Sequence, residues 1–464
     1  MARSRFLAVL LSLAAGMALM ALPLPSSAAA DPLLNRDVTF FSVAHGTYVS
    51  TEISYPEGDT GMLRTRATAV GPWEKYRIVS GGATGVYAIW SYAASQYVSV
   101  ELGHPDNRAG ELRARSAVIG PWEKFSIEVS GDGSLALLSI ANYKWVSAEL
   151  GENGIYKGML RARGDSVGPW EKFRIDGPPK RADGLTKPVY LIHGFSPIPQ
   201  VGGPVNPNEN CASTWAKVRN DFANGAEGPR VTGIIHTVGF YTNDTNCDRR
   251  LVDGTRDTGL LELGKRMANE IYLTYSQYGR PVDVVTHSMG GLIIREALAG
   301  VAARKTGFPP VLYVEDVVTM GTPHKGSTMA GFCGSLGYQQ CKDMTSGSSF
   351  LNQLPENPQS VMGTDWTIMG ADDDETAAAN SAVGVLAQHK VRYPKPQPPG
   401  TPGIEHGSFR TLDGSNGYIF KLRWCGNPAC GNLSSPDPLG GETTAATESP
   451  IYVARLALYY STAR

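Results

Sequence analysis

The segment around Ser288 places a serine among small residues at a turn, a pattern that nucleophilic catalysis needs. From residue 281 it reads PVDVVTHSMGGLIIREALAG, an apolar run followed by a tight turn and then by apolar residues at helical spacing. A serine attacks a carbonyl only if its hydroxyl projects from the backbone and a base removes its proton. A sharp turn between a strand and a helix meets the first need. Ser288 is therefore the candidate nucleophile, although Thr286 stands where the pattern G-x-S-x-G has its first glycine.

Four motifs in the last two thirds of the chain follow one another in a recognisable order. They are VYLIHGF at 189–195, THSMGG at 286–291, TMGTPHKGS at 319–327 and SGSSFLNQL at 346–354. From Pro188 to the C-terminus, the chain resembles secreted bacterial lipases of the α/β-hydrolase fold. Some of those lipases have alanine at the first position of the turn motif, so a small residue other than glycine is tolerated there. The resemblance implies a mostly parallel sheet, ester hydrolysis, and the chain order nucleophile, acid, histidine.

The acid must then follow Ser288, and the segment DWTIMGADDDETAAANSA at 365–382 offers three consecutive aspartates. The resembling lipases often have an aspartate followed by a glutamate at a fixed distance after such a strand. Matching the Trp-Thr start and the Asp-Glu pair selects Asp374, whereas counting from the strand isoleucine selects Asp373. A solvated acidic turn or a calcium site is the competing interpretation. We expect Asp374 to be the acid and keep Asp373 as the alternative.

His406 is the expected base, because it lies in the glycine-rich segment PGTPGIEHGSF on a late loop, as the resemblance requires. His389 is the rival, but it begins the strand-like stretch AQHKVRY, where a histidine is more often structural. His324 precedes the acid and so violates the family order, and we expect it at the rim of the site. His193 is expected to be a structural loop residue, and Asp283 a structural residue before the turn.

These residues define an expected double displacement through an acyl-enzyme. His406 takes the proton of Ser288, which attacks an ester carbonyl, and Asp374 orients the charged imidazole. The developing oxyanion needs donors already in place, and the backbone N–H of Met289 is one of them. By resemblance, the backbone N–H of Phe195 is the other. The expected chemistry uses no cofactor and no metal.

The N-terminus indicates export. Residues 1–30 have two early arginines, an apolar stretch and a run of alanines, which is typical of a signal peptide that ends before Asp31. A membrane anchor is the alternative, but prolines interrupt the apolar stretch, and no later stretch has the length and apolarity of a spanning helix. We therefore expect a secreted, extracellular protein without a transmembrane segment.

The chain has six cysteines, and an even number in an oxidising compartment favours disulfides. Many connectivities are possible, and sequential pairing is preferred because each neighbouring pair lies within one loop excursion. The expected pairs are Cys211 with Cys247, Cys333 with Cys341, and Cys425 with Cys430. The segment CGNPAC could instead indicate a metal site, but it offers only two thiols and has no histidine nearby.

The first third of the chain is a threefold repeat. Polar and apolar residues alternate after each tryptophan of the recurring phrase GPWEK, which predicts strands, and the Gly-Pro before it predicts a turn. One unit alone would expose sheet edges, whereas three can close around a shared core. The repeat is marked in register by Tyr48, Tyr97 and Trp145, which are 49 and 48 residues apart, and by Trp73, Trp122 and Trp170, also 49 and 48 apart.

These repeats resemble a fascin-like β-trefoil over residues 35–177, which implies an all-β domain of three repeats. Related trefoils bind actin, carbohydrates or other proteins, so the resemblance leaves the ligand open, with a carbohydrate or a cell surface as the expected class. Because equivalent positions recur, the tryptophans and Gly-Pro turns are interpreted as shared core and turn residues. The glutamate and lysine of GPWEK are expected to form a solvated face.

The sequence therefore predicts a multidomain protein: a signal peptide at 1–30, a β-trefoil at 35–177, a linker at 178–187 and an α/β-hydrolase lipase domain at 188–464. The expected function is that of an extracellular lipase or carboxylesterase for acylglycerol-type esters, with the trefoil as a targeting module. One alternative is a polymer esterase for cutin, polyhydroxyalkanoate or acylated polysaccharide, and another is an inactive binding protein. The 42 basic and 43 acidic residues create no basic field for nucleic acid.

Overall fold

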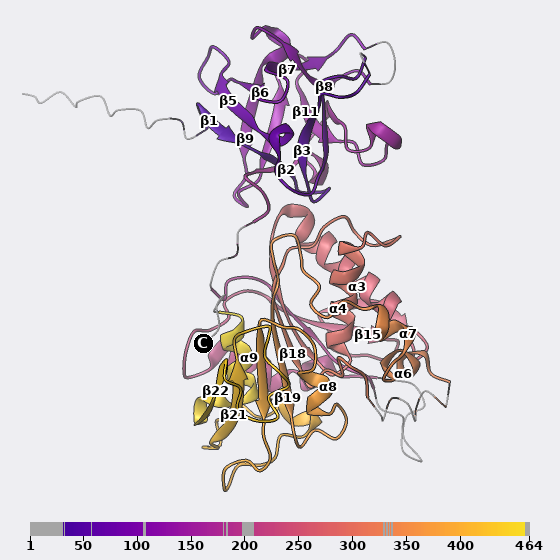
Figure 1. Ribbon diagram of the computed structural model, residues 1–464, viewed down its shortest axis with the longest axis vertical. Coiled ribbons are helices and arrows are strands. Elements are labelled where there is room, and N and C mark those ends of the chain that lie inside the picture. Colours follow the sequence, from indigo (N-terminus) through magenta and orange to yellow (C-terminus); the bar gives the residue numbers. More distant parts are fainter. Residues whose placement is uncertain are drawn as a thin grey trace, which may run out of the picture.

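The computed structural model contains an all-β region and an α/β region, joined by the segment around 177–188 (Figure 1). It describes residues 31, 33–56, 58–104, 108–179, 181, 184–196, 208–327, 330, 333, 335 and 337–459. The predicted signal peptide at 1–30 lies outside the described residues. Among the helices of the described ranges, none combines the length and the apolarity that a membrane crossing requires.

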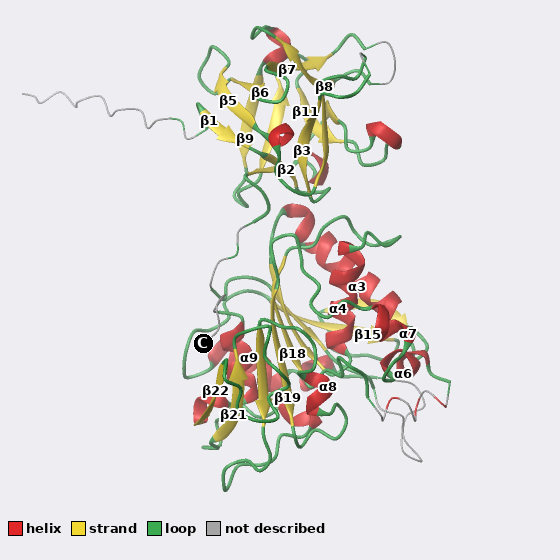
Figure 2. Cartoon of the chain, in the orientation of Figure 1, coloured by secondary structure: helices red, strands yellow, loops and turns green. Residues whose placement is uncertain are grey.

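The all-β region consists of three units of four strands, preceded by one short strand (Figure 2). The strands are β1 (Arg36–Val38), then β2 (Phe40–Ser42), β3 (Thr47–Glu52), β4 (Met62–Ala67) and β5 (Tyr76–Ser80) in the first unit, β6 (Tyr87–Ser91), β7 (Gln96–Glu101), β8 (Glu111–Ser116) and β9 (Phe125–Val129) in the second, and β10 (Leu135–Ser139), β11 (Lys144–Ala148), β12 (Leu160–Gly164) and β13 (Phe173–Ile175) in the third.

The outer strands of the units form a barrel, and the inner strands form three hairpins. Barrel pairing runs β1–β5–β6–β9–β10–β13–β2. The hairpins β3–β4, β7–β8 and β11–β12 contact one another through β4–β8, β8–β12 and a bridge between Arg64 and Met159. This threefold arrangement is the layout of a β-trefoil, and its all-β character agrees with the sequence-based prediction.

A glycine at one equivalent position of each unit allows the hairpins to meet. Each has a positive φ, between +82° and +91°, and a Cβ there would lie 2.4–2.7 Å from a carbonyl oxygen of the neighbouring unit. Each glycine carbonyl also accepts a 2.8 Å hydrogen bond from that neighbour's backbone. The cycle closes because the third unit returns to the first. The contacts are Gly61 to Ala114, Gly110 to Ala162, and Gly158 to Thr65.

The recurring phrase GPWEK forms the short 3-10 helices η1 (Pro72–Glu74), η2 (Pro121–Glu123) and η4 (Pro169–Glu171). Two predictions about it are wrong. The glutamates are not a solvated face but are buried, because each accepts hydrogen bonds from the glycine N–H of its own turn and from a serine hydroxyl. The tryptophans are half exposed rather than core residues, because the aromatic residue three positions later fills the core: Tyr76, Phe125 and Phe173.

The α/β region is built on a nine-stranded mixed sheet. Its strands are β14 (Val189–Ile192), β15 (Ile235–Tyr241), β16 (Arg249–Gly254), β17 (Val282–His287), β18 (Val314–Met320), β19 (Asp365–Ala371), β20 (His389–Tyr393), β21 (Phe420–Cys425) and β22 (Gly440–Ala445). The spatial order is β16-β15-β14-β17-β18-β19-β20-β21-β22. Pairing is parallel from β16 to β20 and antiparallel at the β20–β21–β22 edge, so the sheet is mostly parallel, as expected.

Helices cover both faces of this sheet (Figure 2). On strand β17, the side chain of Val284 packs with one core cluster and that of Val285 with the other, because successive residues of a strand face opposite sides. Helices α3 and α4 belong to the first cluster, and α2 and α9 to the second. The α-helices with described bounds are α1 (Cys211–Thr214), α2 (Ala216–Asn224), α3 (Leu260–Thr274), α4 (Gly290–Ala302), α6 (Gln339–Met344), α7 (Ser349–Gln353), α8 (Ala379–Ala382) and α9 (Pro450–Ala457).

The two regions contact each other through a small apolar cluster. Phe41 and Val43 of the all-β region pack against Val311 and Tyr313 of the α/β region. A Cβ on Gly46 would lie 2.9 Å from Val311 Cβ, so the turn fits closely against this surface. The contact orients the all-β region on the side of the sheet where its parallel strands begin.

The cysteines form the sequential pairs preferred above: Cys211–Cys247, Cys333–Cys341 and Cys425–Cys430. Each pair lies within the α/β region. The first ties α1 to the segment between β15 and β16.

Candidate active site

Ser288 lies between strand β17 and helix α4 with a φ of +56°, a conformation that a residue with a side chain rarely adopts. Two glycines make this turn possible. A Cβ on Gly290 would lie 2.4 Å from Ile192 O, and one on Gly291 would lie 2.2 Å from Thr322 Oγ1. The positive φ lies at the turn between strand and helix that the sequence pattern predicts.

Thr286, which replaces the first glycine of the motif, is fully buried on β17. Its hydroxyl donates to Val318 O of the adjacent strand at 3.3 Å, so the departure from the pattern is accommodated without an unpaired polar group. The turn itself is held by Ser288 N, which donates to Met320 O at 2.9 Å, and by Thr322 Oγ1, which donates to Ser288 O at 2.8 Å.

His406 and Asp374 form a hydrogen-bonded pair. Nδ1 of His406 lies 2.8 Å from Oδ2 of Asp374. The second carboxylate oxygen, Oδ1, accepts from the backbone N–H groups of Thr376 and Ala377 at 2.9 and 2.8 Å. Asp374 is buried, and these donors fix its carboxylate toward the imidazole. His406 begins the 3-10 helix η6 (His406–Arg410), on the late loop that the sequence indicated.

The other two aspartates of the acidic loop point elsewhere. Asp373 pairs with Lys395 Nζ at 2.6 Å, and Asp372 pairs with Arg392 at 2.6 Å. Of the two candidates for the acid, the structure therefore brings Asp374 and not Asp373 to His406.

The His406–Asp374 pair lies against the Ser288 turn. Gly321 directly follows Met320, which holds the turn, and a Cβ on Gly321 would lie 2.9 Å from Asp374 Oδ2 and 3.3 Å from His406 Nδ1. On the other side, the ring of His287 is 4.6 Å from the ring of His406, centroid to centroid. Its Nε2 lies 2.7 Å from His406 O, so His287 is the donor of this hydrogen bond. The pKa of buried His287 lies well below its ordinary value, because burial and then the positive charge of Arg410 disfavour the imidazolium.

Two backbone amides point to an oxyanion site. Gly194, directly before Phe195, approaches the turn so closely that a Cβ there would lie 2.5 Å from Ser288 Cβ and 3.0 Å from Ser288 Oγ. The N–H groups of Phe195 and Met289 have no hydrogen-bond acceptor among the residues that the structure describes. Unpaired N–H groups beside a serine hydroxyl are suited to bind a developing negative charge.

A hydrogen-bond network supports the loop at 193–196. No sequence motif indicated this network. His193 Nε2 lies 3.1 Å from Asp244 Oδ2, and this oxygen also accepts from the backbone N–H groups of Phe240 and Tyr241. Arg256 Nε donates to Ser196 O at 3.1 Å. His193 is thus placed as a structural loop residue. No local motif marks Asp244 and Arg256, because the loop residues that they contact, His193 and Ser196, lie 51 and 60 positions away in the sequence.

The remaining candidates make no contact with the His406–Asp374 pair among the hydrogen bonds and ion pairs of the described residues. His389 begins β20 and contacts Asp365 at the start of β19, whereas Ser288 and Asp374 follow the ends of their strands. Asp283 is fully buried, and burial raises its pKa although Lys187 Nζ lies 3.4 Å away. Buried His324 contacts Thr319 Oγ1 at 2.9 Å, and burial lowers its pKa well below the ordinary value.

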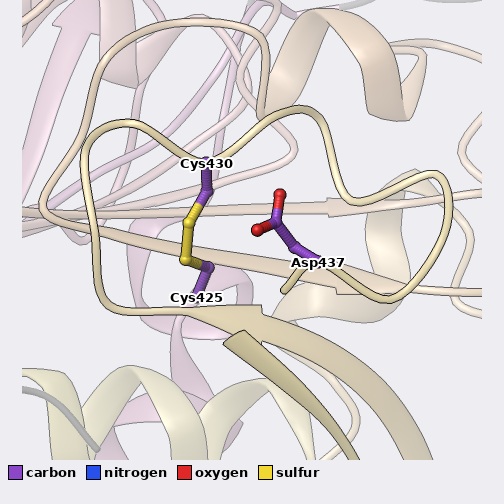
Figure 3. Close-up of side chains that lie close together, drawn as sticks. All are labelled: Cys425, Cys430 and Asp437. Atoms are coloured by element: carbon purple, nitrogen blue, oxygen red, sulfur yellow. A yellow bond between two sulfur atoms is a disulfide. The ribbon is translucent and has the colours of Figure 1, made fainter. Parts of the chain in front are cut away.

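Figure 3 shows a group of side chains at metal-ligand spacing within the described part of the chain, Cys425, Cys430 and Asp437. The two sulfurs are joined in a disulfide, and a zinc ion would require free thiolates. Asp437 accepts from Gly431 N at 3.2 Å and from Leu439 N at 2.9 Å. The disulfide and the hydrogen bonds of Asp437 therefore stabilise this loop, and the group does not form a metal centre.

A family model described as "Putative serine esterase (DUF676)" matches residues 251–357. The match contains Ser288 and ends before Asp374 and His406. It supports an enzyme of the serine-hydrolase type. No curated protein matches the chain.

Three solved structures resemble part of the chain, each with a TM-score of 0.26. The designed threefold-symmetric protein ThreeFoil is 15% identical, and the match covers 30% of this chain and 96% of ThreeFoil. A Polyporus squamosus lectin bound to a human-type influenza-binding epitope is 14% identical, with 31% and 49% covered. The Macrolepiota procera ricin B-like lectin in complex with lactose is 12% identical, with 31% and 97% covered. At these scores, the binding properties of these proteins do not extend to this chain.

Proposed function

We propose that the protein is an extracellular serine carboxylic-ester hydrolase that acts as a lipase on acylglycerol-type esters. The observation that carries the proposal is the 2.8 Å contact between His406 Nδ1 and buried Asp374 Oδ2, beside the strained turn at Ser288. In the same proposal, the α/β region has the α/β-hydrolase fold and the all-β region is a fascin-like trefoil. The three disulfides are compatible with an oxidising, extracellular setting.

In the acylation half-reaction, Ser288 Oγ attacks the ester carbonyl carbon while His406 Nε2 takes the hydroxyl proton. Asp374 accepts a hydrogen bond from Nδ1–H, which keeps the Nε2 lone pair available and stabilises the imidazolium that forms. The oxyanion accepts hydrogen bonds from the N–H groups of Met289 and Phe195. When the tetrahedral intermediate collapses, His406 returns the proton to the leaving alkoxide and the acyl group stays on Ser288.

In the deacylation half-reaction, a water molecule takes the place of the alcohol. His406 removes one of its protons, and the hydroxide oxygen attacks the acyl carbon of the ester on Ser288. The same two N–H groups stabilise the second oxyanion. Collapse of this intermediate breaks the bond to Ser288 Oγ, which recovers its proton from His406, and the carboxylic acid is released.

The test begins with a fluorophosphonate probe, which labels a serine only if it is activated as a nucleophile. We expect labelling of Ser288 in the wild-type chain and none in Ser288→Ala. A wild-type chain that remains unlabelled would instead support the alternative in which the protein only binds its target.

The substrate class is tested separately. Triolein, short p-nitrophenyl esters, and films of cutin or polyhydroxyalkanoate should be compared at equal enzyme concentration. We expect the highest kcat/KM on acylglycerols. A clear preference for a polymer film would keep the serine mechanism and replace the lipase assignment by that of a polymer esterase.

A further inference from the structure

Four of the positions in and directly after GPWEK have a structural task in every repeat. The glycine N–H donates to the glutamate, the proline starts the 3-10 turn, the glutamate is buried, and the aromatic residue after the lysine fills the core. The tryptophan has no comparable task. Trp122 and Trp170 keep 39% and 41% of their surface exposed, and Trp73 is half-buried.

An exposed tryptophan is unusual, because an indole contributes a large apolar area when it is buried. None of the three indole N–H groups donates a side-chain hydrogen bond to a described residue. Each repeat therefore presents an aromatic plane and a free donor at the same place on the trefoil. Aromatic side chains of this kind are enriched where proteins bind their partners.

An arginine lies seven residues before each of these tryptophans in the sequence. Its side chain is 39–46% exposed and forms an ion pair with a glutamate whose side chain is at most 9% exposed, at the end of the neighbouring strand of the same hairpin. In the first repeat, Arg66 Cζ lies 5.7 Å from the centroid of the Trp73 ring. We call these groups the indole sites: Trp73, Arg66 and Glu52; Trp122, Arg115 and Glu101; Trp170, Arg163 and Glu149.

The anchored arginine keeps N–H groups for a ligand. In the third indole site, Nε and Nη2 of Arg163 both donate to the carboxylate of Glu149, which fixes the guanidinium plane. A guanidinium has more N–H groups than this pair uses. In the first indole site, Nε and Nη2 of Arg66 likewise donate to Glu52, and Arg66 Cζ lies 5.7 Å from the centroid of the Trp73 ring, so an apolar surface and hydrogen-bond donors are held side by side.

The net charge of the indole sites indicates which class of ligand they can bind. Each arginine is neutralised by its own buried glutamate, so an indole site has no net charge with which to attract phosphate. This disfavours nucleic acids and anionic lipid surfaces, whose binding depends on unpaired cations. A pyranose ring fits both features, because its C–H face is apolar and its hydroxyls accept and donate hydrogen bonds.

We propose that the three indole sites bind a neutral polysaccharide, with one sugar unit stacked on each indole and hydroxyls bound by the arginine. A polymer repeats its units, so one chain or one surface can occupy several sites of the same trefoil. Linked sites of modest individual affinity then give tight overall binding. This inference goes beyond the proposed hydrolysis and does not depend on it.

The test is depletion of the full chain from solution by insoluble polysaccharides: microcrystalline cellulose, chitin, starch granules and xylan. We expect the wild-type chain to bind at least one of them. The triple variant Trp73→Ala, Trp122→Ala, Trp170→Ala should bind at least about 10²-fold more weakly, because avidity is lost with the sites. The affinity of each single variant should lie between those of the wild type and the triple variant. Equal binding of the triple variant and the wild type would overturn the proposal, as would the absence of binding to all four polymers.

Two controls separate a lost site from a lost fold. The triple variant with phenylalanine at the three positions keeps an aromatic plane and should recover much of the binding. Tyr143→Asn removes another aromatic side chain of the trefoil, 74% exposed, at a positive φ that asparagine tolerates, and should bind like the wild type.

Two further measurements complete the test. Hydrolysis of a soluble p-nitrophenyl ester should be unchanged in the triple variant, and polymer binding should be unchanged in Ser288→Ala, so failure of this inference and failure of the proposed hydrolase are distinguishable. If the indole sites instead bind a membrane, the triple variant loses binding to phosphatidylcholine vesicles and not to polysaccharide, which contradicts the proposal.

Discussion

His287 Nε2 donates a hydrogen bond of 2.7 Å to the backbone carbonyl oxygen of His406. The residue that precedes the proposed nucleophile therefore holds the backbone of the proposed base, although the two histidines are 119 residues apart. This bond connects the turn after β17 to the late loop that carries His406.

The bond predicts a positioning role for His287. Replacement by leucine removes the donor, and misplacement of the His406 backbone should lower kcat by about 10²-fold with little change in KM. Glutamine, which retains an N–H donor, should restore most of the activity. Steady-state kinetics on a soluble ester measure both variants, and a leucine variant with the wild-type kcat would show that the bond does not position the base.

Ser288→Ala should abolish ester hydrolysis. Loss of the attacking oxygen is expected to lower kcat by roughly 10⁵- to 10⁶-fold, as for other serine nucleophiles. The far-UV circular dichroism and the melting temperature should stay close to those of the wild type, because the change removes a single oxygen atom. Activity above about one hundredth of the wild-type rate in a folded variant would refute the assignment of the nucleophile.

The neighbouring aspartates provide a matched pair of variants. Asp374→Asn should lower kcat by about 10⁴-fold, since an amide in its place no longer stabilises the imidazolium or fixes its tautomer. Asp373→Asn, one residue away, removes only the ion pair with exposed Lys395 and should change kcat less than about threefold. The kinetics of the two variants decide between the candidates, and the reverse order of effects would make Asp373 the acid.

His45 should make stability depend on pH. It lies in the turn that packs against the α/β region, and burial, then the positive charge of Arg304, lower its pKa from 6.5 to about 4. Between these values the unfolded chain binds a proton that the folded chain does not, so the free energy of unfolding falls as the pH falls from about 6.5 to 4. The contribution is on the order of 1–3 kcal/mol.

The variant His45→Asn isolates this contribution, because asparagine occurs naturally at the equivalent position of the third repeat, Asn142. In both the wild type and the variant, buried His287 and His324 also make the free energy of unfolding fall as the pH falls, since burial lowers their pKa. Urea unfolding between pH 4 and 7 should show a smaller loss of stability in the variant. Parallel pH profiles would mean that folding does not change the pKa of His45.

Local sequence patterns were sufficient to predict those parts of the structure that depend on residues close together in the chain. The turn at Ser288 follows from a strand, a helix and two glycines within ten residues, and it appears where the sequence indicated. The threefold repeat predicted three equivalent units of short strands, because one pattern that recurs in register folds in the same way each time, and the structure gives each unit four strands. Likewise, the proximity of neighbouring cysteines in the chain was enough to indicate their pairing.

Only the tertiary structure decided which side chains meet. Asp372, Asp373 and Asp374 are alike in sequence, yet their carboxylates face Arg392, Lys395 and His406, because a turning loop directs successive residues differently. The sequence predicted that the tryptophan of GPWEK is buried and that its glutamate is solvated. In the structure, the glutamates are buried and the tryptophans are half exposed. A glutamate can be buried when a glycine N–H and a serine hydroxyl satisfy it, and that serine comes from another strand. Sequence thus determined the backbone elements of this protein, whereas the hydrogen-bond partners of its polar side chains depended on segments that meet only when the chain is folded.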